Sequence, residues 1–174
     1  MASNFIDDWL YYQSGNESHP IHNKWSALCV LSTIIGRRVY FLPETIEDAY
    51  SQLCFIPNIY TCLVGPQGGR KTFSKDEARD FLVEAFPEYP LSASVESREE
   101  ICRYLGSDEA IRAYSDENNS PVEYRPYTFT INELKNSISI DPVRMIDFWV
   151  DIYDRKEYVV RTKNKGHDVI TNPY

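Results

Sequence analysis

The sequence lacks a long apolar run and lacks the layout of a secretion signal. Its 174 residues carry a formal net charge of −8 and are 43% apolar and 25% charged. No apolar stretch approaches the roughly 18 residues that span a bilayer. The first residues, MASNFIDDWLYY, include acidic side chains where a signal peptide has a basic region followed by an apolar one. These absences predict a cytoplasmic globular protein without a membrane partner.

Cysteine and histidine are too scattered to indicate a disulfide framework or a metal centre. The cysteines form no pair with metal-ligand spacing, and each has apolar neighbours, among which a free cysteine behaves as a small buried hydrophobe. They are Cys29, Cys54, Cys62 and Cys102. His19 and His22 form an H-x-x-H pattern, but no further ligand accompanies them. We interpret them as polar residues ahead of a helix.

Apolar periodicity and capping signals predict the secondary structure. Helices are expected at 4–13, at 23–35 and from the glycine-rich stretch to Phe86. A fourth helix is expected at 97–106, with a capping box of Ser97 and Glu100. A fifth is expected from Asp141 onward, with Pro142 at its first position. Buried strands are expected at 58–64 and 127–131, a further strand at 37–42, and a proline-broken loop at 115–126. Around residue 65 the predicted order is therefore strand, glycine-rich loop and helix.

Residues 65–72 combine the features that binding of a polyphosphate requires. They are Gly65, Pro66, Gln67, Gly68, Gly69, Arg70, Lys71 and Thr72. Glycines let backbone N–H groups converge on an anion, a lysine reaches the β- and γ-phosphates, and a hydroxyl holds Mg²⁺ beside them. A helix that begins at the loop directs its positive end toward the phosphates. The pattern predicts a site for ATP and Mg²⁺, with Lys71 on the phosphates and Thr72 on the metal.

Position 70 departs from the usual pattern, in which a glycine precedes the lysine. If the position requires a positive φ, Arg70 strains the loop. If it lies in the right-handed helical region, the arginine costs nothing and adds a positive charge near the phosphates. A plain glycine-rich turn is the alternative interpretation of the whole loop, but it does not explain the Lys71-Thr72 pair after a predicted buried strand.

Hydrolysis of ATP also requires an acid near the attacking water. Glu133 follows the predicted strand 127–131 and would lie at its carboxyl edge, where it could orient or deprotonate water. Asn132 stands where an aspartate often holds Mg²⁺ through water, so metal binding there should be weaker. Alternatively, Asn132 and Glu133 only cap the helix that follows.

The end of the chain is basic although the chain as a whole is acidic. Residues 155–174 contain five basic side chains against two acidic ones. Two β-prone runs flank Asn164-Lys165-Gly166 and predict a hairpin. Arg161, Lys163 and Lys165 on this hairpin are candidates for contacts with a nucleic-acid backbone. Alternatively, they are solubilising charges on an exposed turn.

The chain resembles the P-loop ATPases of phages, prophages and mobile elements, which are primase-associated, helicase-like proteins. The most specific piece is GPQGGRKT, because this group often has a residue other than glycine before the lysine. Weaker agreement comes from HNKWSALCVLSTIIGRRV, SASVESREEICRYL and TINELKNSI, and MIDFWVDIYDRKEYVVRTKNKGHDVITNPY agrees in layout. The resemblance extends over most of the chain.

The resemblance implies a RecA- or AAA-like ATPase that acts on DNA as a homo-oligomer in a bacterial host cell. The expected fold class is α/β, with a P-loop NTPase-like, mostly parallel sheet flanked by helices. Residues 1–50 would form an N-terminal helical extension, and residues 51–174 a partial core that ends in the basic hairpin. In such cores a further strand with a γ-phosphate sensor follows, so the resemblance also implies a truncated chain with little hydrolysis of its own. The alternative is a degenerate loop in a scaffold or protein-interaction module.

Overall fold

The computed structural model describes residues 4–36, 39, 57–92, 97–115, 118–139, 142–153, 157–162, 166–171 and 173. Contacts divide the chain into two compact units, one made of Met1–Ile35 and Pro57–Tyr89, the other of Gly36–Ile56 and Pro90–Tyr174. The boundary predicted between residues 50 and 51 lies outside the described residues. The division into 1–50 and 51–174 therefore stays a prediction.

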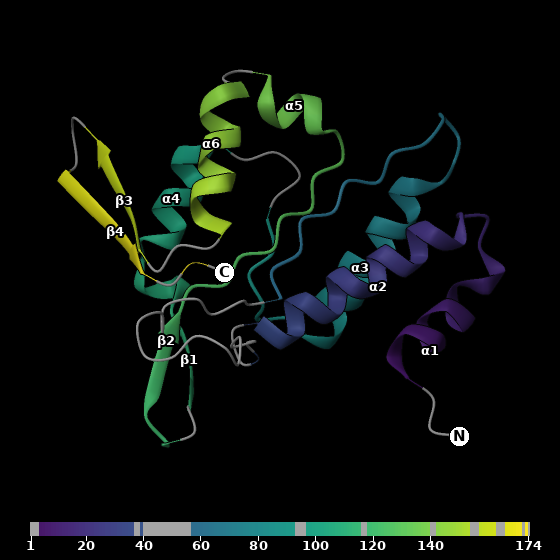
Figure 1. The fold of residues 1–174 in the computed structure, drawn as a ribbon, viewed down its shortest axis with the longest axis horizontal. Helices are drawn as coiled ribbons and strands as arrows, with labels where there is room; N and C mark the ends of the chain where they lie inside the picture. Colours follow the sequence, from purple (N-terminus) through teal and green to yellow (C-terminus); the bar gives the residue numbers. More distant parts are fainter. Residues whose placement is uncertain are drawn as a thin grey trace, which may run out of the picture. The chain divides into compact units, whose positions relative to one another are not determined.

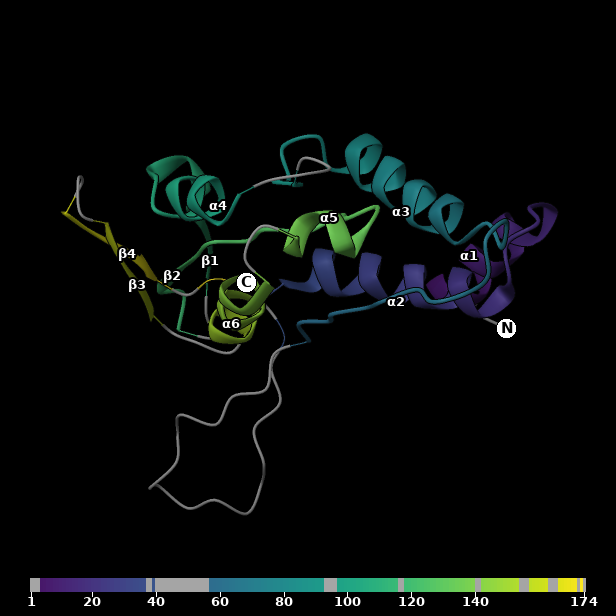
Figure 2. The ribbon, with the colours of Figure 1, turned by 90° about the horizontal axis from the view of Figure 1, so that it is seen from above.

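The first unit contains the predicted helices before and after the glycine-rich loop. They are α1 (Phe5–Tyr12), α2 (Pro20–Ile35) and α3 (Lys71–Ala85), with a 3-10 turn η1 (Gln13–Gly15) after α1 (Figure 1). α2 packs against both α1 and α3, as Figure 2 shows from above. The three predicted helices are confirmed, although α2 begins earlier than expected, at Pro20. Proline suits a first turn because its φ is helical and its missing N–H would have no partner there.

An aromatic cluster joins α1 to α3. Trp9 is 4% exposed, and its ring lies 5.4 Å from that of Phe81 in an edge-to-face arrangement. Phe5 approaches both rings, at centroid distances of 5.8 Å to Trp9 and 6.1 Å to Phe81. Each such pair adds about 0.5–1.5 kcal/mol beyond the burial of apolar area. The amino-terminal helix is thereby fixed to the helix that follows the glycine-rich loop.

The interior of the first unit is unusually polar. Its buried polar side chains are Gln13, Ser18, His22, Asn23, Ser26, Ser32, Thr33 and Ser74. Its buried apolar side chains include Trp9, Ala27, Val30, Ala78 and Leu82. Because a buried polar group costs free energy unless it is hydrogen-bonded, this interior indicates a specific hydrogen-bond network in addition to apolar packing.

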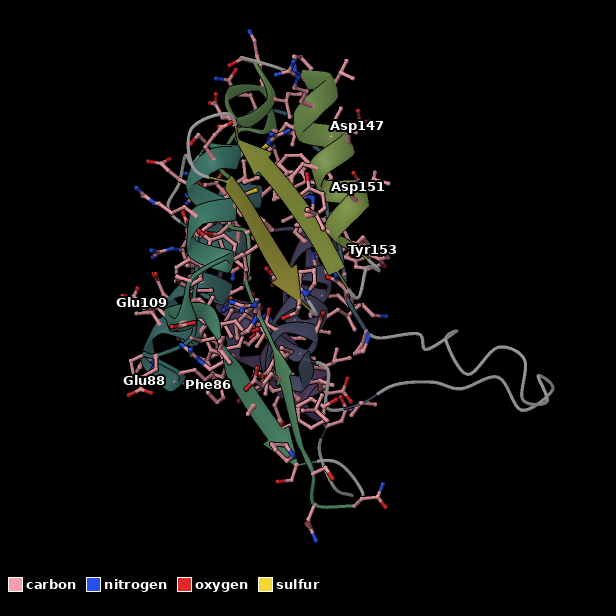
Figure 3. All side chains as sticks on the ribbon, turned by 90° about the vertical axis from the view of Figure 1, so that its left-hand side faces the viewer. Phe86, Glu88, Glu109, Asp147, Asp151 and Tyr153 are labelled. Carbon is pink, nitrogen blue, oxygen red and sulfur yellow. The ribbon has the colours of Figure 1, made fainter. Side chains whose placement is uncertain are left out.

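The second unit surrounds a hydrophobic core. Its elements are α4 (Arg98–Leu105), the 3-10 turn η3 (Asp108–Ala110), β1 (Arg112–Ser115), β2 (Pro121–Tyr124), α5 (Leu134–Ile138), α6 (Pro142–Tyr153), β3 (Glu157–Thr162) and β4 (Gly166–Thr171). β3 contacts α6 and β4 contacts α4, so the hairpin lies against both helices (Figure 3). The most buried core side chains, each at most 1% exposed, are Ile101, Leu105, Phe148 and Ile170.

Three local predictions in the second unit are confirmed. Ser97 and Glu100 form the capping box at the start of α4, and α6 begins at Pro142. The cap predicted for α6, Asp141, lies outside the described residues. β3 and β4 pair in an antiparallel register that starts at Glu157↔Thr171, which confirms the hairpin at the end of the chain.

The loop predicted at 115–126 is wrong, because part of this segment belongs to a second hairpin. β1 pairs with β2 from Arg112↔Tyr124 to Ser115↔Pro121. Proline is tolerated as the first residue of a strand. Tyr114 and Tyr124 lie on the same face and meet edge-on at 5.8 Å. This cross-strand aromatic contact stabilises a pairing that the polar composition of the segment conceals.

The predicted mostly parallel sheet is wrong, and with it the predicted P-loop NTPase-like α/β class. Within the described residues the sheets are two antiparallel pairs, β1–β2 and β3–β4. The runs 58–64 and 127–131 form no regular strand, and the parallel contacts are single bridges, Leu91↔Thr128 and Arg125↔Pro173. Apolar and β-branched residues favour extended backbone, but a strand also needs a neighbouring segment, which composition does not reveal. Of the strand predicted at 37–42, the structure describes residue 39 alone.

The longest helices of the described ranges are α2, with 16 residues, and α3, with 15. In those ranges, none of the helices has the length and apolar character needed to span a bilayer.

Candidate phosphate-binding site

The residues predicted to bind a nucleotide lie together at the amino-terminal end of α3. Residues 57–66 form no helix or strand, a turn follows at 67–69, and α3 begins at Lys71. The N–H of Gly69 donates to the carbonyl oxygen of Pro66 at 3.2 Å and closes the turn. The predicted loop and helix are therefore present, but residues 57–66 provide no regular strand before them.

The three glycines of the loop meet different steric demands. Gly68 has a φ of +83°, a conformation that other residues rarely adopt. A Cβ at Gly69 would lie 3.2 Å from the carbonyl oxygen of Pro66, a tight contact with backbone that cannot swing aside. A Cβ at Gly65 would make ordinary contact with the His22 ring, 3.6 Å from its Cε1. Positions 68 and 69 therefore favour glycine, whereas position 65 has room for a methyl group.

Lys71 folds back over the loop. Its Nζ donates to the carbonyl oxygens of Gly65 and Pro66, each at 3.1 Å. An ammonium group has three N–H donors, so these two bonds hold the charge at the loop and leave a further donor for an anion. The loop thereby keeps one positive charge close to its own backbone.

The amino-terminal end of α3 has no side-chain cap. Arg70 occupies the N-cap position, and its side chain makes no hydrogen bond to the first turn. That turn also contains no acidic residue to balance the positive end of the 15-residue helix. Its N–H groups therefore remain suited to an anionic acceptor. Thr72, the predicted magnesium ligand, is exposed in this turn.

Arg70 adopts the left-handed conformation, with φ 51° and ψ 20°. Of the two alternatives for this position, the strained one applies, at a cost of roughly 1 kcal/mol for a residue with a Cβ. Its guanidinium lies 2.6 Å from the carboxylate of Glu17, but the two side chains are 54% and 75% exposed, so this ion pair contributes little. Its carbonyl oxygen accepts a hydrogen bond from Ser18 Oγ at 2.9 Å.

Buried hydrogen bonds join α2 to α3 behind the loop. Ser74 Oγ donates to Asn23 Oδ1 at 2.7 Å, and both side chains are buried. Asn23 Nδ2 in turn donates to Asn16 Oδ1 at 3.3 Å. His22 lies against Gly65, and its buried Nδ1 has no hydrogen-bond partner among the residues that the structure describes. The first turn of α3 is thus fixed by hydrogen bonds to Asn23 and, through it, to Asn16.

The predicted catalytic and second metal residues lie in the other unit. Glu133 and Asn132 are both exposed and belong to the second unit, whereas the loop belongs to the first. Glu133 occupies the N-cap position of α5, but its side chain makes no capping hydrogen bond. Its catalytic role, and the metal role of Asn132, stay predictions about how the two units act together.

The predicted nucleic-acid contacts lie on the β3–β4 hairpin or at its tip. Arg161 is in β3, where its backbone pairs with His167. Lys163 and Lys165 lie outside the described residues. The hairpin itself is confirmed, and the role of its basic residues stays a prediction.

Sequence reasoning missed the residues that hold the loop in place, Glu17, Ser18, Asn23 and Ser74. Ser18 and Arg70 are 52 positions apart, and no local pattern connects them. One weak signal was available. Asn23 lies inside an otherwise largely apolar helix, where a buried amide requires partners.

In the part of the chain that the structure describes, no group of three or more His, Cys, Asp or Glu side chains could hold a metal ion.

The chain was also compared with known proteins. No protein-family model, no curated protein and no solved structure matches it. The resemblance to helicase-like P-loop ATPases accordingly stays a prediction from the motifs.

Proposed function

We propose that the first unit binds ATP with Mg²⁺ through the loop from Gly65 to Thr72. One observation carries the proposal. The amino-terminal end of α3 has no side-chain cap, and Lys71 at the same end is held by hydrogen bonds to the loop carbonyls. Backbone N–H groups and an ammonium charge at one point are the combination that recognises a polyphosphate. The turn at Gly68 and Gly69 lets the backbone approach such a ligand closely.

Each residue has a distinct role in this proposal. Lys71 neutralises the outer phosphates, and Thr72 supplies its hydroxyl to Mg²⁺. Arg70 brings a second positive charge to the N-cap position, although Glu17 balances part of it. The choice of ATP among nucleoside triphosphates rests on the family resemblance, since no contact to a base is defined.

We expect the activity to be hydrolysis of ATP coupled to action on DNA, by a homo-oligomer in the bacterial cytoplasm. Glu133 is the proposed general base, and Asn132 would support the metal through water. Both roles require the second unit to bring these residues to the phosphates.

One observation favours a second candidate, a degenerate loop in a scaffold or interaction module. Arg70 replaces the glycine that a left-handed position favours, and Glu17 places a carboxylate beside the N-cap. A loop released from nucleotide binding could tolerate both features. The two candidates differ in whether Lys71 matters for the binding of ATP.

Titration of a fluorescent ATP analogue with Mg²⁺ separates the two candidates. The variant Lys71→Ala should bind at least tenfold more weakly than the wild type, because a hydrogen-bonded charge pair is lost. The matched control is Lys75→Ala, which removes the same charge one turn later on α3, where Lys75 contacts Asp76. Equal affinity of the wild type and Lys71→Ala, or no binding by either, would reject the proposed site in favour of the scaffold.

A further inference from the structure

Ser18 makes a buried contact with the residue that precedes the predicted phosphate-binding lysine. Its side chain is 7% exposed, and its Oγ donates to the carbonyl oxygen of Arg70 at 2.9 Å. The same oxygen accepts the first backbone hydrogen bond of α3, from the N–H of Ser74, at the long distance of 3.4 Å. The hydroxyl of Ser18 is therefore the closer of these two donors.

Peptide geometry links this carbonyl to the N–H group of Lys71. In a planar trans peptide, the C=O of one residue and the N–H of the next point in opposite directions. The carbonyl of Arg70 points toward Ser18 and the body of α3, so the N–H of Lys71 points away from the helix body, toward the loop. Fixing the carbonyl therefore also fixes the direction of this N–H donor.

Ser18 is itself held in place by its neighbours. Its backbone N–H donates to Asn16 Oδ1 at 2.9 Å. Asn16 accepts a second hydrogen bond from Asn23, which also accepts one from Ser74 of α3. Asn16 further donates to the buried side chain of Gln13. The turn between α1 and α2 thus carries a connected network that ends at the N-cap of α3.

We propose that Ser18 is a positioning residue of the nucleotide site, which aims the N–H of Lys71 at the phosphates and holds Arg70 in its left-handed conformation. This inference rests on the proposed binding of ATP and extends the site to residues 16–23. On this basis the amino-terminal helices are an integral part of the nucleotide-binding unit and cannot be removed without loss of affinity. Because Arg70 has a Cβ, its left-handed backbone needs a stabilising contact from outside the loop. A glycine at this position would need such a contact less.

A purely structural role for Ser18 predicts a different outcome. In that case its loss would act by lowering the stability of the unit, and loss of another buried serine hydroxyl of the same unit would weaken binding equally. Ser26 is a suitable comparison because it is 5% exposed and donates to the carbonyl oxygen of Asn23, within α2 and away from the loop. Ser26→Ala therefore controls for loss of a buried hydroxyl.

The experiment measures the affinity of the full chain for ATP and for inorganic tripolyphosphate, well below the unfolding temperature of each variant. Ser18→Ala should weaken binding of both ligands about tenfold, because a misdirected N–H no longer meets a charged acceptor. Ser26→Ala should bind as the wild type does. Ser18→Thr retains the hydroxyl, and Ser18→Val has the same shape as the threonine variant but a methyl group in place of the hydroxyl. The Ser18→Thr protein should therefore bind both ligands at least several-fold more tightly than the Ser18→Val protein. This pair decides the question even if Ser18→Ala does not fold.

Each other result has a defined meaning. If the wild type binds both ligands and the Thr and Val variants are equal in affinity, the positioning role is wrong while the proposed function stands. Equal weakening by Ser18→Ala and Ser26→Ala also rejects it, because the effect is then one of stability. If the wild type binds neither ATP nor tripolyphosphate, the proposed function is wrong and the role of Ser18 is wrong with it.

Discussion

At the scale of single residues, Arg70 combines a backbone cost with a compensating contact. A left-handed conformation brings its Cβ close to the following carbonyl group, which costs roughly 1 kcal/mol relative to glycine. The hydrogen bond from Ser18 to its carbonyl offsets part of that cost. The cost persists because the surrounding unit determines the conformation more strongly than the residue's own preference.

Arg70→Gly should raise the free energy of unfolding by about 0.5–1 kcal/mol. Glycine removes the Cβ contact, and the greater entropy of the unfolded chain cancels part of the gain. Urea unfolding followed by circular dichroism measures the change. The control is Arg70→Ala, which removes the exposed ion pair but keeps the strain, and it should not be stabilised. A glycine variant less stable than the alanine variant would contradict the left-handed conformation.

The cysteines should differ in reactivity according to their surroundings. Burial raises the pKa of the Cys29 thiol above its ordinary value, and the hydrogen bond with Thr61 offsets this rise in part. Cys102 is buried, whereas Cys62 is exposed. Because the thiolate is the reactive form, iodoacetamide at neutral pH should modify Cys62 well before Cys29 or Cys102. Mass spectrometry of a time course measures this order, and faster labelling of Cys29 than of Cys62 would disprove it.

At the scale of elements, the start of α4 shows a local signal that acts as expected. Ser97 Oγ accepts from the N–H of Glu100 at 3.2 Å, and the carboxylate of Glu100 accepts from the N–H of Ser97 at 3.0 Å. Both partners lie within four consecutive residues, so no distant contact is needed to form them. The apolar face of the helix then packs Ile101 and Leu105 into the core.

Ser97→Ala should lower the free energy of unfolding by about 1 kcal/mol, because the first turn of α4 loses an acceptor for its N–H groups. Ser97→Thr retains the hydroxyl and should lie close to the wild type. Chemical denaturation of the three proteins at neutral pH provides the measurement. An alanine variant as stable as the wild type would show that the cap contributes nothing to the fold.

The capping box should also give α4 a dependence on pH in the acid range. The hydrogen bond from the N–H of Ser97 and, to a smaller extent, the one from its hydroxyl lower the pKa of Glu100 below its ordinary value. A lowered folded-state pKa means that the contribution to stability is complete above the unfolded value of about 4.3 and is lost as the pH falls through the lower folded value. Glu100→Gln cannot titrate, so its unfolding midpoint should change less than that of the wild type between about pH 6 and pH 3. Parallel acid profiles would contradict the capping role of this carboxylate.

At the scale of the whole molecule, the candidate functions are divided between two units. The candidate phosphate-binding loop belongs to the first unit, and Glu133 and the basic hairpin belong to the second. Binding of ATP is therefore a property that the first unit could supply without the second. The proposed hydrolysis and the proposed action on DNA would require both.

The basic hairpin should contact a nucleic-acid backbone through charge alone. A variant with Arg161→Ala, Lys163→Ala and Lys165→Ala should bind a fluorescent single-stranded oligonucleotide more weakly, with a salt slope reduced by roughly two to three. The control removes three exposed basic residues elsewhere, Lys24, Arg103 and Lys135, and should leave the slope unchanged. No binding by the wild type at low salt, or equal slopes for all three proteins, would leave the hairpin as a solubilising turn.

Features that depend on neighbours a few positions apart follow directly from the amino-acid sequence. These are α1, α2 and α3, the capping box of α4, the proline at the start of α6, the hairpin β3–β4 and the turn that leads into α3. Helical periodicity, side-chain caps and turn residues act within about four positions, so a linear pattern contains them. The position of the candidate phosphate site was also readable in this way.

Tertiary contacts determine which extended segments pair with a neighbour and which residues hold the loop in place. The apolar run 58–64 reads as a buried strand, yet no regular strand forms there, because pairing requires a neighbour that only the folded chain supplies. The hairpin β1–β2 contains an aromatic contact of Tyr114 with Tyr124 across the two strands, which the linear pattern does not show. The carbonyl of Arg70, a residue in the left-handed conformation, accepts a hydrogen bond from Ser18, which lies 52 positions earlier in the chain. Such contacts arise from tertiary packing and not from local conformational preference, so no sequence motif predicts them.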